Sequence, residues 1–475
     1  MAEKLLKFVS VEQQMPVKRA AQKRLDDFNE VYAEFDHEGA AEQASRCSQC
    51  GVPFCHIHCP LGNNIPDWLR LTAEGRLEDA YEMATSTNNM PEICGRICPQ
   101  DRLCEGNCVI EKDFNSVTIG SVEKYIADTA WDKGWVKPIT PLVEQEQSVG
   151  IIGAGPAGLA AAEELRKAGF QVHIYDRHDR AGGLLVYGIP GFKLEKDVVG
   201  RRTGRLEQSG ITFHLDFEIG RDASLADLRE KHDAILVATG VYRARGLKVP
   251  GVGLSNIHEA LDYLIASNKK SFGDSVPEFE NGNLDAEGKD IVVIGGGDTA
   301  MDCVRTAVRQ GAKSVKCVYR RDRDNMPGSV REVQNAEEEG VEFVWLSGPE
   351  AFVGDDKVEA VRAYKMRLGA PDSTGRQAPE PVPGSTYTMG CDLAILALGF
   401  EPEDLPALFG APELRVTRWG TVTVDHQSMM SNLKGVFAAG DIVRGASLVV
   451  WAIRDGRDAA ESIKKFLKEQ KAVAA

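Results

Sequence analysis

Residues 148–176, "SVGIIGAGPAGLAAAEELRKAGFQVHIYD", decide the fold of this 475-residue chain. The stretch runs from a short apolar strand through a glycine-rich turn into an alanine-rich helix, and it ends in a second strand. Residues 289–321, "KDIVVIGGGDTAMDCVRTAVRQGAKSVKCVYRR", repeat that order. The repeat predicts an α/β protein with two Rossmann-like dinucleotide-binding domains.

The first glycine-rich turn carries the fingerprint G-x-G-x-x-G at Gly153, Gly155 and Gly158. The first glycine permits the tight turn, the second lets the backbone approach a pyrophosphate, and the third lets helix and strand pack closely. Asp176 ends the second strand, 18 residues beyond Gly158, where an acid accepts a hydrogen bond from a ribose 2′-hydroxyl. Strand, helix and acid together predict a dinucleotide site.

The second turn has the variant G-x-G-x-x-A at Gly295, Gly297 and Ala300. Asp298 and Thr299 lie inside this fingerprint, at the start of the expected helix, and are further candidates for nucleotide binding.

No acid ends the second strand of this unit. Arg320 and Arg321 stand there instead, 20 and 21 residues beyond Ala300. A guanidinium can hold a 2′-phosphate with two hydrogen bonds, so the site is expected to prefer NADPH over NADH. Arg323 is a weaker candidate, and the alternative is that these arginines form a solvated surface turn. Two dinucleotide sites in one chain indicate a flavoprotein that takes hydride from a nicotinamide.

Cysteine is distributed unevenly. Of the eleven cysteines, eight lie in two groups near the N-terminus and three are expected to be core thiols. The first group is Cys47, Cys50, Cys55 and Cys59, the second is Cys94, Cys98, Cys104 and Cys108, and the core thiols are Cys303, Cys317 and Cys391. Zinc favours paired C-x2-C knuckles, of which there is one, and a redox dithiol needs only two cysteines. Eight thiols with Cys-Pro in both groups favour two [4Fe–4S] clusters, with His56 and His58 as packing residues rather than ligands.

The bulk composition limits the function classes. A net charge of −15 argues against a nucleic-acid partner or an anionic membrane surface. The first twenty residues contain no apolar run of a signal peptide, and nowhere do about 20 apolar residues run together. We therefore expect a cytoplasmic protein without a membrane partner, in a compartment that keeps its thiols reduced.

The expected domains are separated where the composition and the pattern of expected helices and strands change. We expect an amphipathic helix over residues 19–36, a helix over 119–132 and a polar, proline-bearing linker over 137–147. The expected domains are a helical iron–sulfur domain (1–145), the first part of an FAD domain (146–285), an NADPH domain (286–394) and the second part of the FAD domain (395–475).

Three further segments resemble the flavoprotein reductases with two dinucleotide domains. "GVFAAGD" (435–441) is similar to their second FAD motif, which implies that Gly440 and Asp441 lie near the ribityl and pyrophosphate of FAD. "VATG" (237–240), which ends in Gly240, resembles their closing strand. "AGGLLVYGIP" (181–190), which contains Gly183, is similar to the segment that wraps the flavin. The resemblance also implies that the NADPH domain is inserted into the FAD domain.

Over nearly the whole chain, the cysteine segments "CSQCGVPFCHIHCPLGNNIPDWL" and "PEICGRICPQDRLCEGNCV" followed by the two nucleotide units resemble the small (β) subunits of NADPH-dependent glutamate synthases. Dihydropyrimidine dehydrogenase carries the same module. The resemblance implies crossed ligand sets, with Cys47, Cys50, Cys55 and Cys108 on one cluster and Cys59, Cys98 and Cys104 on the other. Glu123, which matches a glutamine ligand of that relative, and Cys94 compete for the remaining position; Glu123 is slightly favoured.

The resemblance implies that electrons pass from NADPH through FAD and two clusters to a large (α) subunit, which carries the amidotransferase and FMN sites and makes two glutamates from glutamine and 2-oxoglutarate. No acid–base catalytic residue is assigned, because the cofactors carry the chemistry. The alternatives are an NADPH:ferredoxin-type oxidoreductase subunit of another complex, and a structural subunit whose clusters only support folding.

Overall fold

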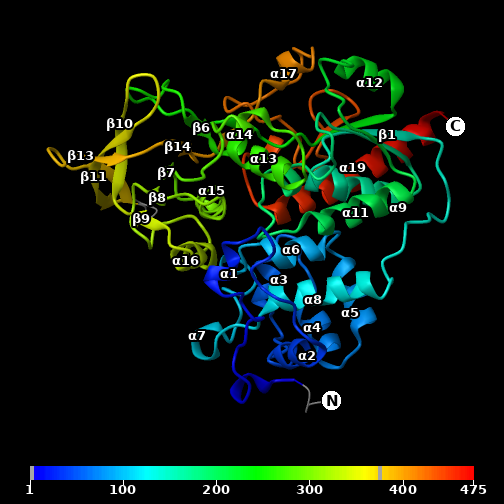
Figure 1. Ribbon diagram of the computed structural model, residues 1–475. Helices are drawn as coiled ribbons and strands as arrows, with labels where there is room; N and C mark the ends of the chain where they lie inside the picture. The colour runs from blue at the N-terminus through cyan, green and yellow to red at the C-terminus, as the bar shows by residue number, and fades with distance from the viewer. Residues whose placement is uncertain (1–4, 373–376, 475) are drawn as a thin grey trace.

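The computed structural model describes residues 5–372 and 377–474 and contains a helical N-terminal part and two parallel sheets covered by helices (Figure 1). The expected fold class is confirmed. In Figure 1 the helical part, blue to cyan, lies below both sheets. Within the described ranges, no helix combines the length and the apolar character needed to cross a bilayer.

The N-terminal part is built from short helices around one small core. Proline stands in the first turn of α4 and α6, and the Asp36 carboxylate caps α2 by accepting a hydrogen bond from the Gly39 N–H at 2.7 Å. The expected helix over 119–132 is confirmed as α8. The elements are η2 (Lys7–Val9), α1 (Ala21–Arg24), α2 (His37–Ser45), α3 (Phe54–Ile57), α4 (Ile65–Ala73), α5 (Leu77–Thr85), α6 (Pro91–Ile97), η3 (Gln100–Arg102), α7 (Glu111–Phe114) and α8 (Ile119–Asp132).

The expected helix over residues 19–36 is wrong. Only α1 forms there, and the chain beyond it is irregular. The Asp27 carboxylate accepts a hydrogen bond from the Asn29 N–H at 3.0 Å, a local contact that competes with helix formation. The Val31 N–H donates to the Phe192 carbonyl oxygen at 3.2 Å. The Phe28 ring also lies 6.2 Å from the Phe192 ring, so the segment covers a neighbouring part of the molecule instead of forming one helix.

The first sheet has the order β16-β4-β1-β2-β3 and is parallel throughout. Helices α9, α11 and α19 cover one face, and α12 with the chain around α17 covers the other. Because both faces are covered, the central strands β4 and β16 are continuous buried apolar runs, whereas the edge strand β3 is polar and partly exposed. The strands are β1 (Ser148–Ile152), β2 (Gln171–Tyr175), β3 (Thr212–His214), β4 (Ala234–Val237) and β16 (Val436–Ala438); the helices are α9 (Pro156–Lys167), α10 (Leu184–Tyr187), α11 (Lys196–Gln208), α12 (Leu225–Lys231), α17 (Leu405–Leu408), α18 (Asp441–Arg444) and α19 (Val449–Ala474).

The second sheet has the order β6-β14-β7-β8-β9 and is also parallel. Helices α13, α15 and α16 cover one face, and an antiparallel sheet covers the other. The parallel strands are β6 (Ile257–Glu259), β7 (Asp290–Ile294), β8 (Ser314–Val318), β9 (Glu342–Val344) and β14 (Leu393–Leu396); the helices are α13 (Ala260–Ser271), α14 (Pro277–Glu280), α15 (Asp298–Arg309) and α16 (Val330–Glu338). The antiparallel strands are β10 (Ser347–Val353), β11 (Ala360–Pro371), β12 (Gln377–Pro381) and β13 (Tyr387–Gly390).

The second unit is inserted into the first, as the resemblance implied. After β14 the chain returns to the first sheet, where β16 pairs with β4. The outward and return connections form a two-stranded antiparallel ribbon of β5 (Arg243–Ala244) and β15 (Phe400–Glu401).

The second sheet begins earlier than the expected NADPH range of 286–394. Strand β6 lies within 146–285, yet it pairs with β14 of the second sheet, and β14 ends at Leu396. A three-residue strand leaves no periodic pattern in the sequence, so its sheet is decided by pairing alone. The division into four domain segments stays a prediction.

Candidate functional site

The turn between β1 and α9 has the shape that a dinucleotide pyrophosphate needs. Gly153 has a φ of +110°, and a Cβ there would lie 2.4 Å from the Ala238 carbonyl oxygen. A Cβ on Gly158 would lie 2.0 Å from the Gly153 carbonyl oxygen, whereas a Cβ on Gly155 would meet no atom within 4 Å. The backbone at Gly155 therefore faces open space at the N-terminus of α9, where an anion is stabilised.

Asp176 directly follows β2 and is buried beside this turn. One carboxylate oxygen accepts a hydrogen bond from the Ala154 N–H at 2.7 Å, and the other accepts one from the His178 N–H at 2.9 Å. The carboxylate also lines a small cavity together with Thr239, Tyr242 and other residues. This cavity adjoins the fingerprint turn and offers an acceptor for ribose hydroxyls.

The other candidates for the first nucleotide surround the same helix N-terminus. Gly183 has a φ of +53°, and a Cβ there would lie 2.9 Å from the Gly155 Cα. Gly240 and Gly440 have φ values of +71° and +78°, which favour glycine. Asp441 begins α18, and burial raises the pKa of its carboxyl to about 6. A carboxyl with that pKa accepts a hydrogen bond from a ligand hydroxyl more readily as it ionises.

The second fingerprint repeats the first geometry. A Cβ on Gly295 would lie 2.3 Å from the Ala397 carbonyl oxygen, and a Cβ on Gly297 would meet nothing within 4 Å. Ala300 is fully buried in α15. Asp298 and Thr299 are the first two residues of α15, and both line the central cavity described below.

Arg320 and Arg321 lie just beyond β8, as the sequence predicts. Arg320 is exposed, the Arg321 Nε is buried without a hydrogen-bond partner, and within residues 5–372 and 377–474 neither forms an ion pair. Arg323, in contrast, pairs with Glu337 at 2.8 Å. The first two arginines thus have donors to offer an anionic ligand, and the third is already paired.

The structure brings Cys47, Cys50, Cys55 and Cys108 together, although Cys108 lies in the second cysteine group of the sequence. Burial raises the pKa of the Cys47 thiol to about 11 and that of Cys55 to about 12, and the nearby Cys108 contributes to both shifts. The Gln49 side-chain amide donates to the Cys47 Sγ at 3.2 Å.

The second set consists of Cys59, Cys98 and Cys104, with Cys94 and Glu123 beside them. Contact with Cys94 and burial raise the pKa of Cys98, and burial raises that of Cys104. Glu123 raises the pKa of all three thiols, and Cys94 raises those of Cys59 and Cys98. Both candidates therefore adjoin the set.

Two amides orient the Glu123 carboxyl. Asn63 and Asn88 donate to its Oε1 at 3.0 and 3.1 Å, and burial raises its pKa to about 8. The Cys94 thiol lies 3.8 Å from the Asn88 Oδ1. These contacts place one carboxyl and one thiol beside the same amide, that of Asn88.

The donor set suits iron–sulfur clusters. Among the described residues, no three His, Cys, Asp or Glu side chains converge as ligands of one ion. A four-iron cluster takes ligands on separate irons, so its thiolates surround it instead of meeting at a point. Burial favours the protonated form of six of these thiols, those of Cys47, Cys55, Cys59, Cys98, Cys104 and Cys108. Bound iron would offset that cost by stabilising the thiolate form.

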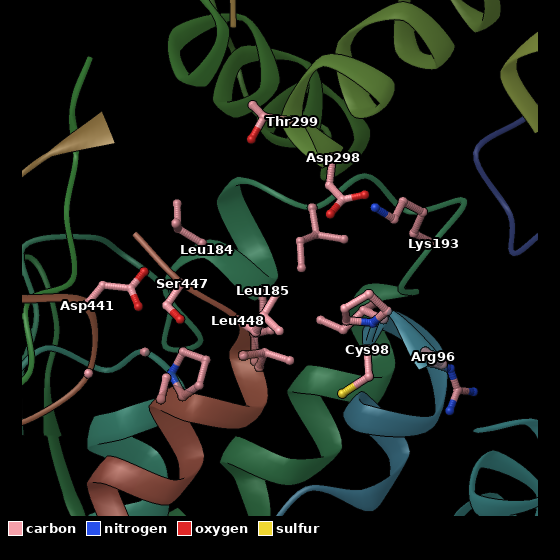
Figure 2. A pocket seen from close by; sticks show the side chains of 18 of the residues that line it. Arg96, Cys98, Leu184, Leu185, Lys193, Asp298, Thr299, Asp441, Ser447 and Leu448 are labelled. Carbon is pink, nitrogen blue, oxygen red and sulfur yellow. The ribbon is translucent and has the colours of Figure 1, made fainter. Parts of the chain in front are cut away.

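A central cavity of about 270 Å³ joins the three parts of the molecule (Figure 2). The start of α9 and Asp441 contribute one wall, Asp298 and Thr299 a second, and Cys98 with its neighbours a third. Tyr242 lines both this cavity and the small cavity at Asp176. A cofactor spanning both cavities would run from the ribose acceptor to a point where the second fingerprint and the thiols meet.

Comparisons with known proteins match the N-terminal part of the chain and the nucleotide-binding part to two known families. Residues 24–135 match the family described as dihydropyrimidine dehydrogenase domain II, 4Fe-4S cluster, and residues 147–456 match pyridine nucleotide-disulphide oxidoreductase. The chain is 68% identical over 467 residues to the glutamate synthase [NADPH] small chain of Azospirillum brasilense, covering 98% of this chain and 97% of the relative. The chain belongs to the glutamate synthase small-chain family.

Two further relatives of this chain, both from Escherichia coli, have different names. The glutamate synthase [NADPH] small chain of Escherichia coli is 43% identical and covers 98% of this chain and 100% of its own. The putative oxidoreductase AegA of Escherichia coli is 44% identical, covering 95% of this chain and 69% of AegA. Among solved structures, Mycobacterium tuberculosis FprA in complex with NADPH has a TM-score of 0.59 at 20% identity, covering 70% of this chain and 86% of FprA, a likeness of fold.

Sequence reasoning missed several residues of the central cavity in this family member. Lys193 reaches from the loop after α10 to Asp302 on α15, at 2.9 Å, and lies 3.8 Å from Glu332 on α16. All three line the cavity. Asp302 lies on the polar face of α15 with Arg305 and Arg309, a face that looks solvent-exposed in the sequence but is buried in the structure. Nothing pointed to Lys193, because its partner lies more than a hundred residues away.

Proposed function

We propose that this chain is the NADPH-oxidising subunit of glutamate synthase, which feeds electrons to a large subunit. The central cavity carries the proposal, because both fingerprint helices and Cys98 line it. No other described cavity touches all three. When bound, NADPH and FAD would supply hydride transfer, and the iron–sulfur clusters would supply single-electron steps.

The residues of the first unit would hold FAD. Gly155 leaves room for the pyrophosphate at α9, Gly153 and Gly158 keep the turn closed, and Asp176 accepts from the adenosine ribose. Gly183, Gly240, Gly440 and Asp441 would surround the ribityl chain and the ring. These roles fit the open space at Gly155 and the continuous path past Tyr242.

The residues of the second unit would hold NADPH. Gly295, Gly297 and Ala300 shape the turn, Asp298 and Thr299 lie at the cavity, and Arg320 with Arg321 would hold the 2′-phosphate. Because α15 points its N-terminus at the same cavity as α9, the nicotinamide would meet the flavin there. The chain's task is thus to orient two ring systems and exclude water.

The thiols would hold two [4Fe–4S] clusters, and Cys98 lines the central cavity. The set of Cys59, Cys98 and Cys104, completed by Glu123, would hold the inner cluster next to the flavin. We favour Glu123 over Cys94 because two amides fix its carboxyl beside all three thiols. Cys47, Cys50, Cys55 and Cys108 would hold the outer cluster, from which electrons leave.

The acceptor would be the large glutamate synthase subunit, which carries the amidotransferase and FMN sites. High identity to named small chains supports this partner. We also propose a cytoplasmic location, since every cysteine is free and a reducing compartment keeps it so.

A second candidate is the electron-input part of another NADPH-dependent complex. The match to AegA favours it, because that relative shares this module and has a different name.

Anaerobic NADPH oxidation by the native complex separates the two. Oxidation that requires both glutamine and 2-oxoglutarate, with glutamate formed, is the expected result. Oxidation that ignores both substrates but is rapid with ferredoxin would support the second candidate. Failure of NADPH to reduce any cluster would contradict both and favour a structural role.

A further inference from the structure

The segment between Cys98 and Cys104 lies directly on the second nucleotide unit. Asp101 accepts a hydrogen bond from the Val330 N–H at 3.3 Å, at the start of α16. Arg331 donates to the Gln100 side chain at 3.4 Å and to the Glu105 carboxylate at 3.2 Å. Several contacts therefore hold this part of the iron–sulfur domain at the N-terminal ends of α15 and α16.

Arg102 in this segment points at the second fingerprint. Its Nη2 lies 3.5 Å from the Oδ2 of Asp298, the first residue of α15. Asp298 directly follows Gly297, where the backbone is open for a pyrophosphate. Among the described residues, Arg102 is the sole ion-pair partner of Asp298.

Docking alone does not account for Arg102. The side chains of Arg102 and Asp298 are 45% and 37% exposed, and such a pair contributes at most about 1 kcal/mol to stability. The neighbouring pair of Arg331 with Glu105, whose side chain is 8% exposed, is better placed to fasten the two parts. The Arg102 guanidinium keeps most of its donors for another ligand.

The charges around Asp298 indicate which ligand Arg102 would bind. A dinucleotide pyrophosphate at the N-terminus of α15 would bring negative charge close to the Asp298 carboxylate. A cation at that point would offset the repulsion. Lys193 lies within electrostatic reach of Asp298, but its ion pairs are with Asp302 and Glu332.

We infer that Arg102 of the iron–sulfur domain binds the pyrophosphate of NADP(H), so that the NADPH site is completed by a residue from outside its own domain. This inference rests on the proposed NADPH site. Arg102 stands four residues after Cys98 and two before Cys104. Nucleotide binding would therefore act directly on the segment that carries two thiols of the inner set.

The test is calorimetric titration of the purified native complex with NADP⁺ and with NAD⁺, at low and high salt. R102A is expected to raise the Kd of both nucleotides about tenfold, because the pyrophosphate is common to them. The preference for NADP⁺ stays unchanged, since the 2′-phosphate is held elsewhere. The salt dependence of binding falls, because salt screens a charge that R102A has removed.

Three further variants sharpen the test. R102Q removes the charge while keeping a polar side chain, and it replaces R102A if that variant loses its iron or flavin. R102K is expected to keep the salt dependence and part of the affinity, because an ammonium lacks the two-pronged geometry. R76A is the matched control, an exposed arginine of the same domain paired with Glu74 and Asp79.

Three results would contradict the inference about Arg102 or the NADPH site on which it rests. Binding by R102A and R102Q that matches R76A and the wild type would overturn the inference while leaving the NADPH site intact. Equal weakening in all three Arg102 variants, with the wild-type salt dependence, would also overturn it and indicate a purely structural arginine. A wild-type complex that binds neither nucleotide would overturn the NADPH site itself.

Discussion

The Lys193 ammonium lies 2.9 Å from the Asp302 carboxylate, and this buried ion pair joins the first nucleotide unit to the second across the central cavity. Burial raises the pKa of Asp302 to about 6, and the lysine charge opposes that shift. The pair therefore fixes two charged side chains in the wall of the cavity, where the nicotinamide is proposed to enter.

K193M is expected to lower the free energy of unfolding by about 3 kcal/mol, because it leaves a buried carboxylate without its main partner. Denaturant unfolding followed by fluorescence measures this. K193M combined with D302N should recover part of the loss; equal stability of K193M and the wild type would contradict the account.

Two glycines of the first fingerprint separate binding from folding. G155A should fold normally but lose FAD, because its Cβ meets no protein atom and would occupy the space of the pyrophosphate. G158A should unfold more easily, by about 1–3 kcal/mol or more, because its Cβ would lie 2.0 Å from a carbonyl oxygen. Flavin content and thermal unfolding of the two variants, compared side by side, check this; normal FAD binding by G155A would be inconsistent with it.

The double variant R320A/R321A should weaken NADPH binding roughly tenfold to a hundredfold and leave NADH binding unchanged, since only NADPH has the 2′-phosphate. R323A is the control, because Arg323 is paired with Glu337. Titration with both nucleotides measures the preference. An equal loss for NADH and NADPH would show that the arginines serve the fold.

C94S is expected to keep the full iron content of two clusters, whereas E123A should lose the inner cluster. E123Q should retain it, because an amide oxygen can replace the carboxylate and the Asn63 and Asn88 contacts survive. Iron analysis and EPR spectra of the reduced chain decide the matter. Loss of iron in C94S with a normal E123A spectrum would reverse the assignment.

Asp441 makes the stability of the FAD-free chain depend on pH. Its folded pKa of about 6 is raised above the ordinary 3.8, because burial penalises the carboxylate. The folded chain then binds the proton more tightly than the unfolded chain. Stability therefore falls as the pH rises from 3.8, the ordinary value, to about 6, and it levels off above that pH. D441N should therefore be more stable than the wild type near neutral pH, by at most about 3 kcal/mol, with no gain below about pH 4. Thermal unfolding across this range tests it; a pH-independent difference would contradict the assignment.

Local patterns were enough for much of the fold. The fingerprints at Gly153 and Gly295 placed both Rossmann turns, and the helix over 119–132 was predicted with its bounds. The prediction of a helix over 19–36 was wrong, because Phe28 packs against Phe192 and Tyr32 contacts Asn335 instead of lying along one helix face. The sequence analysis did not assign β6 to the second sheet, because only its pairing with β14 decides which sheet it joins.

The sequence by itself determined the two dinucleotide turns, the thiol inventory and the family, since each depends on residue type at short spacing. The family resemblance implied that Cys108 lies with Cys47, and the structure brings the two together. Only the tertiary structure decided that Lys193 reaches Asp302 and that Arg102 faces Asp298. These pairs are between 61 and 196 residues apart in the chain. No local pattern encodes such contacts, because they arise when separately folded units bury their surfaces against one another.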